Sequence, residues 1–159
     1  MNHIFLLLLM VFCHIVDDYY LQGWLASAKQ KMWWKDNAPQ SLYKYDYLWA
    51  LIMHSFSWSF MIMLPIFIVS NFTVTGAMLS FLLWNMFIHA FTDNLKANEF
   101  KINLWHDQLI HMCQIGVTWL LYIGGLFWTN IIKLMTGGSL IMLILRQAQR
   151  SSNLIRTMF

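Results

Sequence analysis

Charged residues are scarce in this sequence, at only 11% of its 159 residues. Hydrophobic residues make up 59%, which is too apolar for a soluble domain of this length. Cysteine is equally scarce. The two cysteines, Cys13 and Cys113, lie inside apolar stretches, which argues against a disulfide framework. The sequence also lacks internal repeats and low-complexity tracts, so its apolar stretches must explain most of the fold.

Four apolar stretches are long enough for membrane-spanning helices, which need about 20 mostly apolar residues each. They cover residues 4–21, 48–70, 73–91 and 105–128. We therefore predict an all-α, polytopic membrane protein with four transmembrane helices in an antiparallel bundle over residues 1–129. The first stretch is predicted to be a retained helix, not a signal peptide. His14, Asp17 and Asp18 stand where a cleavage site would need small residues.

The connections and the tail suit the membrane surface. Residues 130–159 are predicted to form a C-terminal interfacial tail with an amphipathic helix over 139–156, which carries Arg146, Arg150 and Arg156. Residues 23–47 mix four lysines with Trp and Tyr, a composition typical of the headgroup layer. We expect membrane lipid as a partner and no nucleic acid, because this loop is tethered to lipid at both ends. A homo-oligomer stays open.

Nearly every ionisable residue inside the apolar stretches lies near one end of its stretch, and these ends alternate between the last and the first residues. His14 and Asp18 close the first stretch, His54 opens the second, and His89 with Asp93 closes the third. The fourth stretch opens with its own His and Asp residues. Successive membrane helices run in opposite directions, so all these groups are expected at one depth. Ionisable groups there are costly and survive when they are paired, hydrated or bound to metal.

The spacing of these residues predicts a metal site. His14 and Asp18, His89 and Asp93, and Asp107 and His111 are each four residues apart, which places each pair on one helical face. The predicted ligands are four imidazoles and three carboxylates: His14, Asp18, His54, His89, Asp93, Asp107 and His111. This thiolate-free set suits one or two divalent transition-metal ions, Zn²⁺, Mn²⁺ or Fe²⁺.

Further polar residues on the same faces are candidate catalytic groups. Lys96 continues the face of His89 and is expected to bind an anionic headgroup or a developing oxyanion. Gln22 and Gln108 are expected to orient water or ligands. Asp17 and His106 fall out of phase with these faces, so we predict surface or headgroup contacts for both.

The distribution of basic residues favours both termini outside and the polar cluster toward the cytoplasm. Six lysines flank the face that carries the cluster: Lys29, Lys31, Lys35, Lys44, Lys96 and Lys101. Four basic residues lie beyond the opposite face: Lys133, Arg146, Arg150 and Arg156. A basic tail that prefers the cytoplasm would reverse this orientation.

The same polar residues resemble the pattern of a known family over about residues 5–125. Four motifs occur in order: His14-x3-Asp18-x2-Leu21-Gln22, His54, His89-x3-Asp93-x2-Lys96 and Asp107-Gln108-x2-His111. This order resembles the domain-of-unknown-function 3307 family of small integral membrane proteins of bacteria and their phages. The resemblance implies a four-helix protein of the bacterial inner membrane. It also implies distant kinship with membrane-bound metal-dependent hydrolases, whose activity is itself inferred.

Together these features predict a membrane-embedded metal-dependent hydrolase that acts on a lipid or lipid-linked phosphoester at headgroup depth. Bound metal would lower the pKa of a coordinated water and supply the nucleophile. Two alternatives stay open. The His/Asp cluster can serve proton or metal-ion conduction, or it can be a polar clasp in a phage or bacterial regulator that binds a membrane partner.

Overall fold

The computed structural model describes residues 2–136, with side chains described as far as residue 125. Every element in the described range is helical, which confirms the predicted all-α class. The chain forms two compact units, Met1–Trp119 and Leu120–Phe159. The predicted boundary after residue 129 falls inside the last helix. The predicted amphipathic helix over 139–156 lies outside the described residues.

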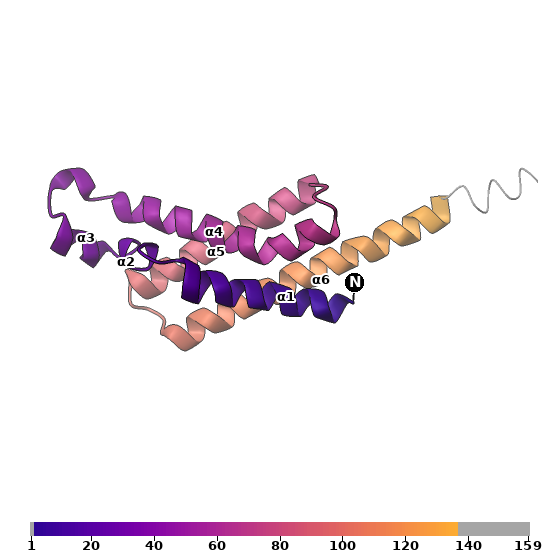
Figure 1. The fold of residues 1–159 in the computed structure, drawn as a ribbon, viewed down its shortest axis with the longest axis horizontal. Coiled ribbons are helices and arrows are strands. Elements are labelled where there is room, and N and C mark those ends of the chain that lie inside the picture. The colour runs from indigo at the N-terminus through magenta and orange to yellow at the C-terminus, as the bar shows by residue number, and fades with distance from the viewer. Residues whose placement is uncertain (1, 137–159) are drawn as a thin grey trace, which may run out of the picture. The chain divides into compact units, whose positions relative to one another are not determined.

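The first apolar stretch forms helix α1 (His3–Ile15), which continues directly into a π-helical turn, η1 (Val16–Leu21) (Figure 1). The side chain of Asn2 caps the start of α1 by accepting a hydrogen bond from the amide of Ile4 at 2.9 Å. At the other end, the amide of Gln22 bonds to the carbonyl of Asp17, five residues back. Such π turns are rare and occur most often at functional sites.

The connection that follows contains three short helices, α2 (Leu25–Ala28), α3 (Lys31–Asn37) and the 3₁₀ turn η2 (Ser41–Tyr43). Gly23 begins this connection with a positive φ of 47°, a conformation that glycine adopts without steric cost. The short helix α2 packs against the next long helix, and Ala28 is fully buried there. The connection is therefore folded into short helices, of which α2 and α3 contact α4, and is not an extended loop.

Three long helices complete the fold: α4 (Asp46–Val69), α5 (Gly76–Ala97) and α6 (Leu104–Thr136). A tight turn in which Asn71 and Phe72 both have positive φ joins α4 to α5, and these two helices pack closely along each other (Figure 1). Each helix begins within three residues of its predicted span, but α5 extends six residues past residue 91. This extension carries Asp93 and Lys96 on regular helix.

The first unit buries polar side chains and exposes apolar ones, the reverse of a soluble bundle. Phe12, Trp49 and Phe87, on three different long helices, are 61%, 68% and 64% exposed. The buried groups on η1 and the four long helices include eight ionisable residues, none more than 7% exposed: His14, Asp17, Asp18, His54, His89, Asp93, Asp107 and His111. An apolar outer surface of this extent is suited to contact with lipid.

Within residues 2–136, two helical stretches are long and apolar enough to cross a membrane, His3–Leu21 and Ser41–Val69. They correspond to the first two predicted spans. Helices α5 and α6 carry several of the buried polar groups, such as Asn85, His89 and His111. These residues lower the average hydropathy of both helices, although their exposed faces are apolar.

Candidate metal centre

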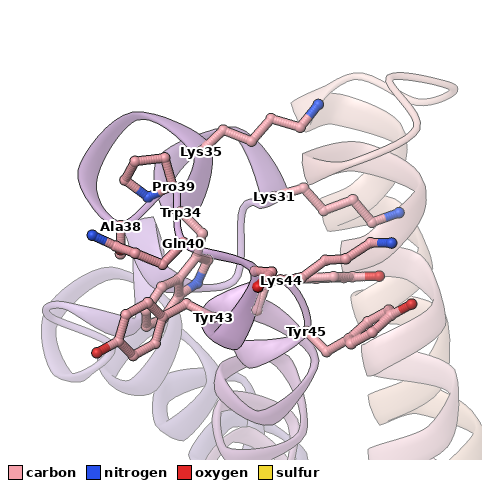
Figure 2. Close-up of a pocket in the computed structure, with 11 residues that line it drawn as sticks. Lys31, Trp34, Lys35, Ala38, Pro39, Gln40, Tyr43, Lys44 and Tyr45 are labelled. Atoms are coloured by element: carbon pink, nitrogen blue, oxygen red, sulfur yellow. The ribbon is translucent and has the colours of Figure 1, made fainter.

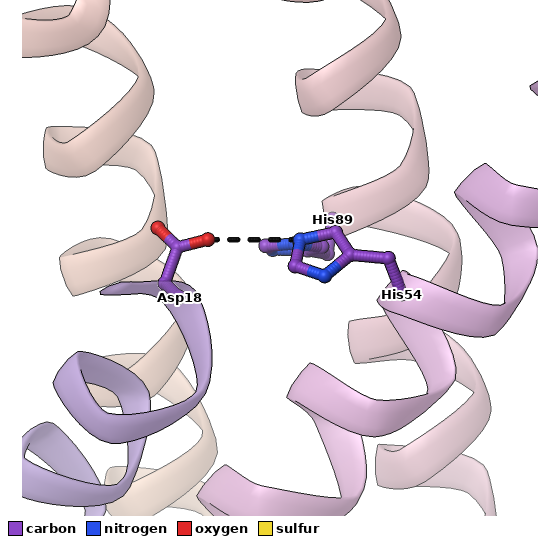
Figure 3. A group of neighbouring side chains, drawn as sticks. All are labelled: Asp18, His54 and His89. Atoms are coloured by element: carbon purple, nitrogen blue, oxygen red, sulfur yellow. Dashed lines mark hydrogen bonds and ion pairs between the residues drawn. The ribbon is translucent and has the colours of Figure 1, made fainter. Parts of the chain in front are cut away.

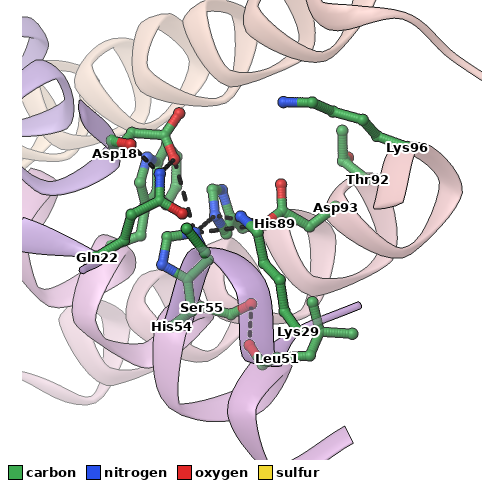
Figure 4. A network of polar contacts seen from close by, with 12 residues as sticks. Asp18, Gln22, Lys29, Leu51, His54, Ser55, His89, Thr92, Asp93 and Lys96 are labelled. Atoms are coloured by element: carbon green, nitrogen blue, oxygen red, sulfur yellow. Dashed lines mark hydrogen bonds and ion pairs between the residues drawn. The ribbon is translucent and has the colours of Figure 1, made fainter. Parts of the chain in front are cut away.

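The structure brings the seven predicted ligands into one buried cluster. The π turn supplies Asp18 next to His14 of α1, and His54 comes from α4. Helix α5 supplies the pair His89 and Asp93, and α6 supplies the pair Asp107 and His111. All seven side chains are buried, as expected if each i, i+4 pair faces the interior. Figure 4 shows Asp18, His54, His89 and Asp93 converging from three of these elements.

The closest group of candidate ligands is formed by His54, His89, Asp18 and Asp93. The Nε2 atoms of His54 and His89 lie 3.1 Å apart. His54 Nε2 is also 3.6 Å from Asp18 Oδ1 and 3.3 Å from Asp93 Oδ2. His89 Nε2 lies 3.7 Å from the same Asp93 oxygen. Figure 3 shows Asp18 facing the two imidazoles from the opposite side.

These separations fit a small metal ion. Ligands that hold Zn²⁺ at 2.0–2.1 Å in a tetrahedron are about 3.3 Å from one another. The described residues contain two overlapping groups in which all donor atoms lie within 4.8 Å, namely Asp18–His54–His89 and His89–Asp93–His111. Both groups include His89, so the cluster is one continuous set of donors.

A neighbouring amide determines which ring nitrogen of a neutral His111 carries the proton. Gln114 donates its Nε2 hydrogen to the carbonyl of Asn85 at 3.2 Å, so its Oε1 faces His111 Nδ1 at 3.3 Å as an acceptor. Nδ1 of His111 therefore carries a proton. Nε2 then faces Asp107 Oδ1 at 3.5 Å and Asp93 Oδ1 at 3.8 Å. A neutral His111 would direct a lone pair at these two oxygens, an arrangement that requires a proton or a cation between them.

The contacts of His14 do not suit its predicted role as a metal ligand. Its Nδ1 accepts the indole hydrogen of Trp58 at 2.7 Å, so Nε2 carries the proton and faces Gln108 Oε1 at 3.1 Å. The amide group of Gln108 then donates to Asp18 Oδ2 at 2.9 Å and to Asp107 Oδ2 at 3.1 Å. Both nitrogens of His14 are thus engaged, and it positions Gln108, which in turn positions two candidate ligands.

Gln22 lies beside Asp18 as predicted for a positioning group. Its amide nitrogen donates to the backbone carbonyl of Asp18 and lies 3.4 Å from Asp18 Oδ1. Its own carbonyl oxygen is buried and has no hydrogen-bond partner in the described part of the chain. Gln22 therefore has one free acceptor close to the cluster.

The prediction of a surface contact for Asp17 is wrong, whereas His106 is exposed as expected. Asp17 is only 1% exposed and accepts a hydrogen bond from Ser57 at 2.6 Å. The reason is helical geometry, because residues three apart also share a face and Asp17 follows His14 by three. His106 bonds to the neighbouring side chain of Asn103 at 2.8 Å and stays outside the cluster.

Two lysines pair with the carboxylates, and only one of them was anticipated. Lys96, expected on this face, lies 2.6 Å from Asp107 Oδ2. Lys29, which the sequence placed in the headgroup layer, is 8% exposed, and its ammonium lies 2.5 Å from Asp93 Oδ2. Asn98 fixes this position because it accepts from the amide of Lys31 and donates to the carbonyl of Lys29. No periodic signal marks Lys29, since it comes from a connection.

Trp58 is a second residue that sequence reasoning missed. It is fully buried, and its ring stacks on His89 with centroids 4.2 Å apart and planes 16° from parallel. Together with its hydrogen bond to His14, this contact orients two imidazoles at once. Its position four residues after His54 was the available signal, because that spacing puts both on one helical face.

An open cavity of about 640 Å³ leads to the cluster, and we call it the site cavity. Its polar lining includes Asp18, Gln22, Lys29, Asp93, Lys96 and Gln108. Its rim is apolar and exposed, with Tyr20 and Phe100 at 77% and 76% exposure. The carboxylates of the cluster can therefore be reached by a molecule with a polar group and an apolar attachment.

Comparisons with protein-family models, with curated proteins and with solved structures find no match to this chain.

Proposed function

We propose that this protein is a membrane-embedded, metal-dependent hydrolase that acts on a lipid or lipid-linked phosphoester at headgroup depth. The observation that supports this proposal best is the convergence of His54, His89, Asp18 and Asp93 at ligand-to-ligand spacing beside an open cavity. The resemblance of the four motifs to the domain-of-unknown-function 3307 family agrees with it. The location that follows is the bacterial inner membrane.

The proposed membrane location requires that α5 and α6 cross the membrane, in addition to the apolar stretches His3–Leu21 and Ser41–Val69. In support, the exposed face of α5 carries Leu83, Trp84 and Phe87, and that of α6 carries Leu109 and Val117. The polar residues that lower the hydropathy of these helices are buried against other helices. A spanning helix tolerates polar groups when they face the interior of the bundle and are paired there.

The charge of the cluster favours one divalent ion. Four buried carboxylates, from Asp17, Asp18, Asp93 and Asp107, are close to two ammonium groups, from Lys29 and Lys96. With neutral imidazoles this leaves a formal charge of −2, which one divalent ion balances. A buried net charge of this size is otherwise costly. A second ion would need an added anion, such as the phosphate of a substrate.

The chain's own residues would supply binding and positioning. A divalent ion held by His54, His89, Asp18 and Asp93 would supply Lewis acidity and a more acidic water. Lys96, which is one-third exposed, can leave Asp107 to bind a phosphate oxygen. Asp107 Oδ1 is buried without a hydrogen-bond partner among the described residues, so it can accept a proton from an attacking water. The apolar rim of the site cavity would receive the lipid chain.

A second candidate is a structural clasp, and a specific observation favours it. The charged groups already pair with one another, as Lys29 does with Asp93 and Lys96 does with Asp107. Protonation of His111 between Asp93 and Asp107 would satisfy its Nε2 without metal. In that case the cluster would only hold the four helices together.

Hydrolysis measurements on the purified full-length protein test the proposal. The protein is reconstituted in nanodiscs with phosphatidic acid or phosphatidylglycerol, loaded with Zn²⁺, Mn²⁺ or Fe²⁺, and assayed for released phosphate or glycerol phosphate. We expect turnover with one of these metals, loss of turnover on chelation, and none for Asp93→Asn. Absence of turnover for every metal and lipid, in protein that binds metal, would contradict the hydrolase and leave a non-catalytic metal site.

A further inference from the structure

A second pocket lies outside the metal cluster, in the connection between the first two long helices (Figure 2). It has a volume of about 290 Å³, and we call it the loop pocket. Its lining includes three lysines and four aromatic residues: Lys31, Lys35, Lys44, Trp34, Tyr43, Tyr45 and Tyr47. Trp34 and Tyr43 stack with ring centroids 6.2 Å apart and form a flat aromatic wall.

The lysines of the loop pocket differ from the other lysines that the structure describes. Lys29, Lys96 and Lys101 each pair with a carboxylate at 2.5–2.7 Å. Among the described residues no ion pair is formed by the three lysines of the loop pocket. Instead, Lys31 lies 5.0 Å from the ring centre of Tyr47, and Lys44 lies 5.2 Å from that of Tyr45.

Figure 2 shows the ammonium groups of Lys31 and Lys44 extending to the same side, to which the side chain of Tyr45 also points. The two ammonium groups carry like charges, and an anion between them would convert their repulsion into attraction. A phosphate group has the charge and the several acceptor oxygens that this set of donors requires. The chemistry of the loop pocket is thus that of a phosphate site with an aromatic wall.

We propose that the loop pocket binds the phosphate headgroup of an anionic phospholipid, separately from the metal cluster. The inference rests on the proposed membrane location but not on metal binding or hydrolysis. Residues 41–45 of the pocket open the apolar stretch Ser41–Val69, so they lie where that helix would leave the membrane. Lysines and aromatic rings are the residues that meet anionic headgroups at this depth.

Native mass spectrometry of the delipidated full-length protein, titrated with phosphatidylglycerol or phosphatidylcholine, tests this proposal. We expect phosphatidylglycerol to bind more tightly than phosphatidylcholine. Lys44→Gln should weaken phosphatidylglycerol binding about fivefold, and Lys31→Gln with Lys44→Gln about 25-fold. The matched control is Lys101→Gln, which removes the same charge from an exposed lysine outside the pocket and should change little. Circular dichroism verifies that each variant is folded.

Two results would overturn the proposal. Equal losses for Lys44→Gln and Lys101→Gln would mean that lipid is attracted by overall charge and not by the pocket. Tight, lysine-dependent binding of soluble glycerol phosphate, equal to that of the lipid, would assign the pocket to a free phosphate compound. Metal content is measured on the same samples. It should be unchanged in all three variants, so failure of the metal proposal is distinguishable from failure of this one.

Discussion

The Nε2 atoms of His54 and His89 lie 3.1 Å apart in a fully buried position between α4 and α5. Their Nδ1 atoms have no hydrogen-bond partner in the part of the chain that the structure describes. Two imidazole nitrogens at this distance need a proton or a cation between them. Asp18 and Asp93 lie beside the pair. A cation at this site would therefore meet neutral nitrogen donors and anionic oxygen donors.

Removal of a proposed ligand should abolish metal binding. We expect His89→Ala and Asp93→Asn to lose more affinity than the 10–100-fold that loss of an outer partner typically costs. Titration of each purified variant against a chromophoric chelator measures this. His106→Ala is the control, since this residue is exposed and outside the cluster, and its affinity should equal that of wild type. Equal losses in the control would indicate general destabilisation.

Lys29 should compete with the metal for Asp93. Because its ammonium lies 2.5 Å from Asp93 Oδ2, Lys29→Gln removes a buried positive charge from a candidate ligand. We expect metal affinity to rise by about tenfold or more. The same chelator titration measures the change, with Lys101→Gln as the exposed control. A fall in affinity would show that Lys29 supports the site and does not oppose the ion.

Trp58 should act on the metal through its hydrogen bond to His14. Trp58→Phe keeps a ring on His89 but removes the indole donor, so His14 can change tautomer and release Gln108. We expect one metal per chain to remain, with affinity reduced about tenfold. Trp84→Phe, on the exposed face of α5, is the matched control. An unchanged affinity for Trp58→Phe would remove this role for His14.

Asp17 should contribute to the stability of the fold and not to metal binding. Ser57→Ala leaves the Asp17 carboxylate without its 2.6 Å hydrogen bond in a buried position, at a cost of about 1–3 kcal/mol in the free energy of unfolding. Denaturation in detergent measures the change, and metal content is expected to stay at the wild-type value. Ser80→Ala, at an exposed serine, should be close to neutral. Loss of metal in Ser57→Ala would place Asp17 among the ligands.

Lys96 should affect turnover and leave metal binding intact. Lys96→Ala removes a partly exposed ammonium that lines the site cavity but cannot coordinate an ion. We expect turnover of a lipid phosphoester to fall by about 100-fold, the size typical of a lost oxyanion donor. Lys101→Ala, whose lysine pairs with Glu99 on the surface, provides the comparison. Identical behaviour of the two variants would make Lys96 an interfacial anchor.

Much of the buried His/Asp cluster could be predicted from the sequence, because its side chains meet through helical periodicity. The pairs His89–Asp93 and Asp107–His111 need only regular helix to share a face, and the alternation of helix direction brings them to one level. The all-α class follows from the same apolar stretches. The helix starts are within a few residues of the expected positions, since polar or turn residues precede each one.

The remaining features depend on tertiary contacts that no short pattern encodes. The contact of Lys29 with Asp93 depends on Asn98, directly after α5, which bonds to the carbonyl of Lys29 and the amide of Lys31. The engagement of both nitrogens of His14 depends on Trp58 and Gln108, which come from two other helices. The burial of Asp17, in contrast, is predictable from the sequence, because it follows His14 by three residues and this spacing also shares a helical face.

The stoichiometry of bound metal tests the central claim most directly. The full-length protein is purified in detergent without chelator, exposed to Zn²⁺, Mn²⁺ or Fe²⁺, desalted and analysed by inductively coupled plasma mass spectrometry. The His54→Ala/His89→Ala double variant is treated in parallel. Wild type should retain close to one divalent ion per chain, as the charge of the cluster requires, and the double variant should retain none. Equal metal content in the two proteins would contradict the metal centre and favour the clasp.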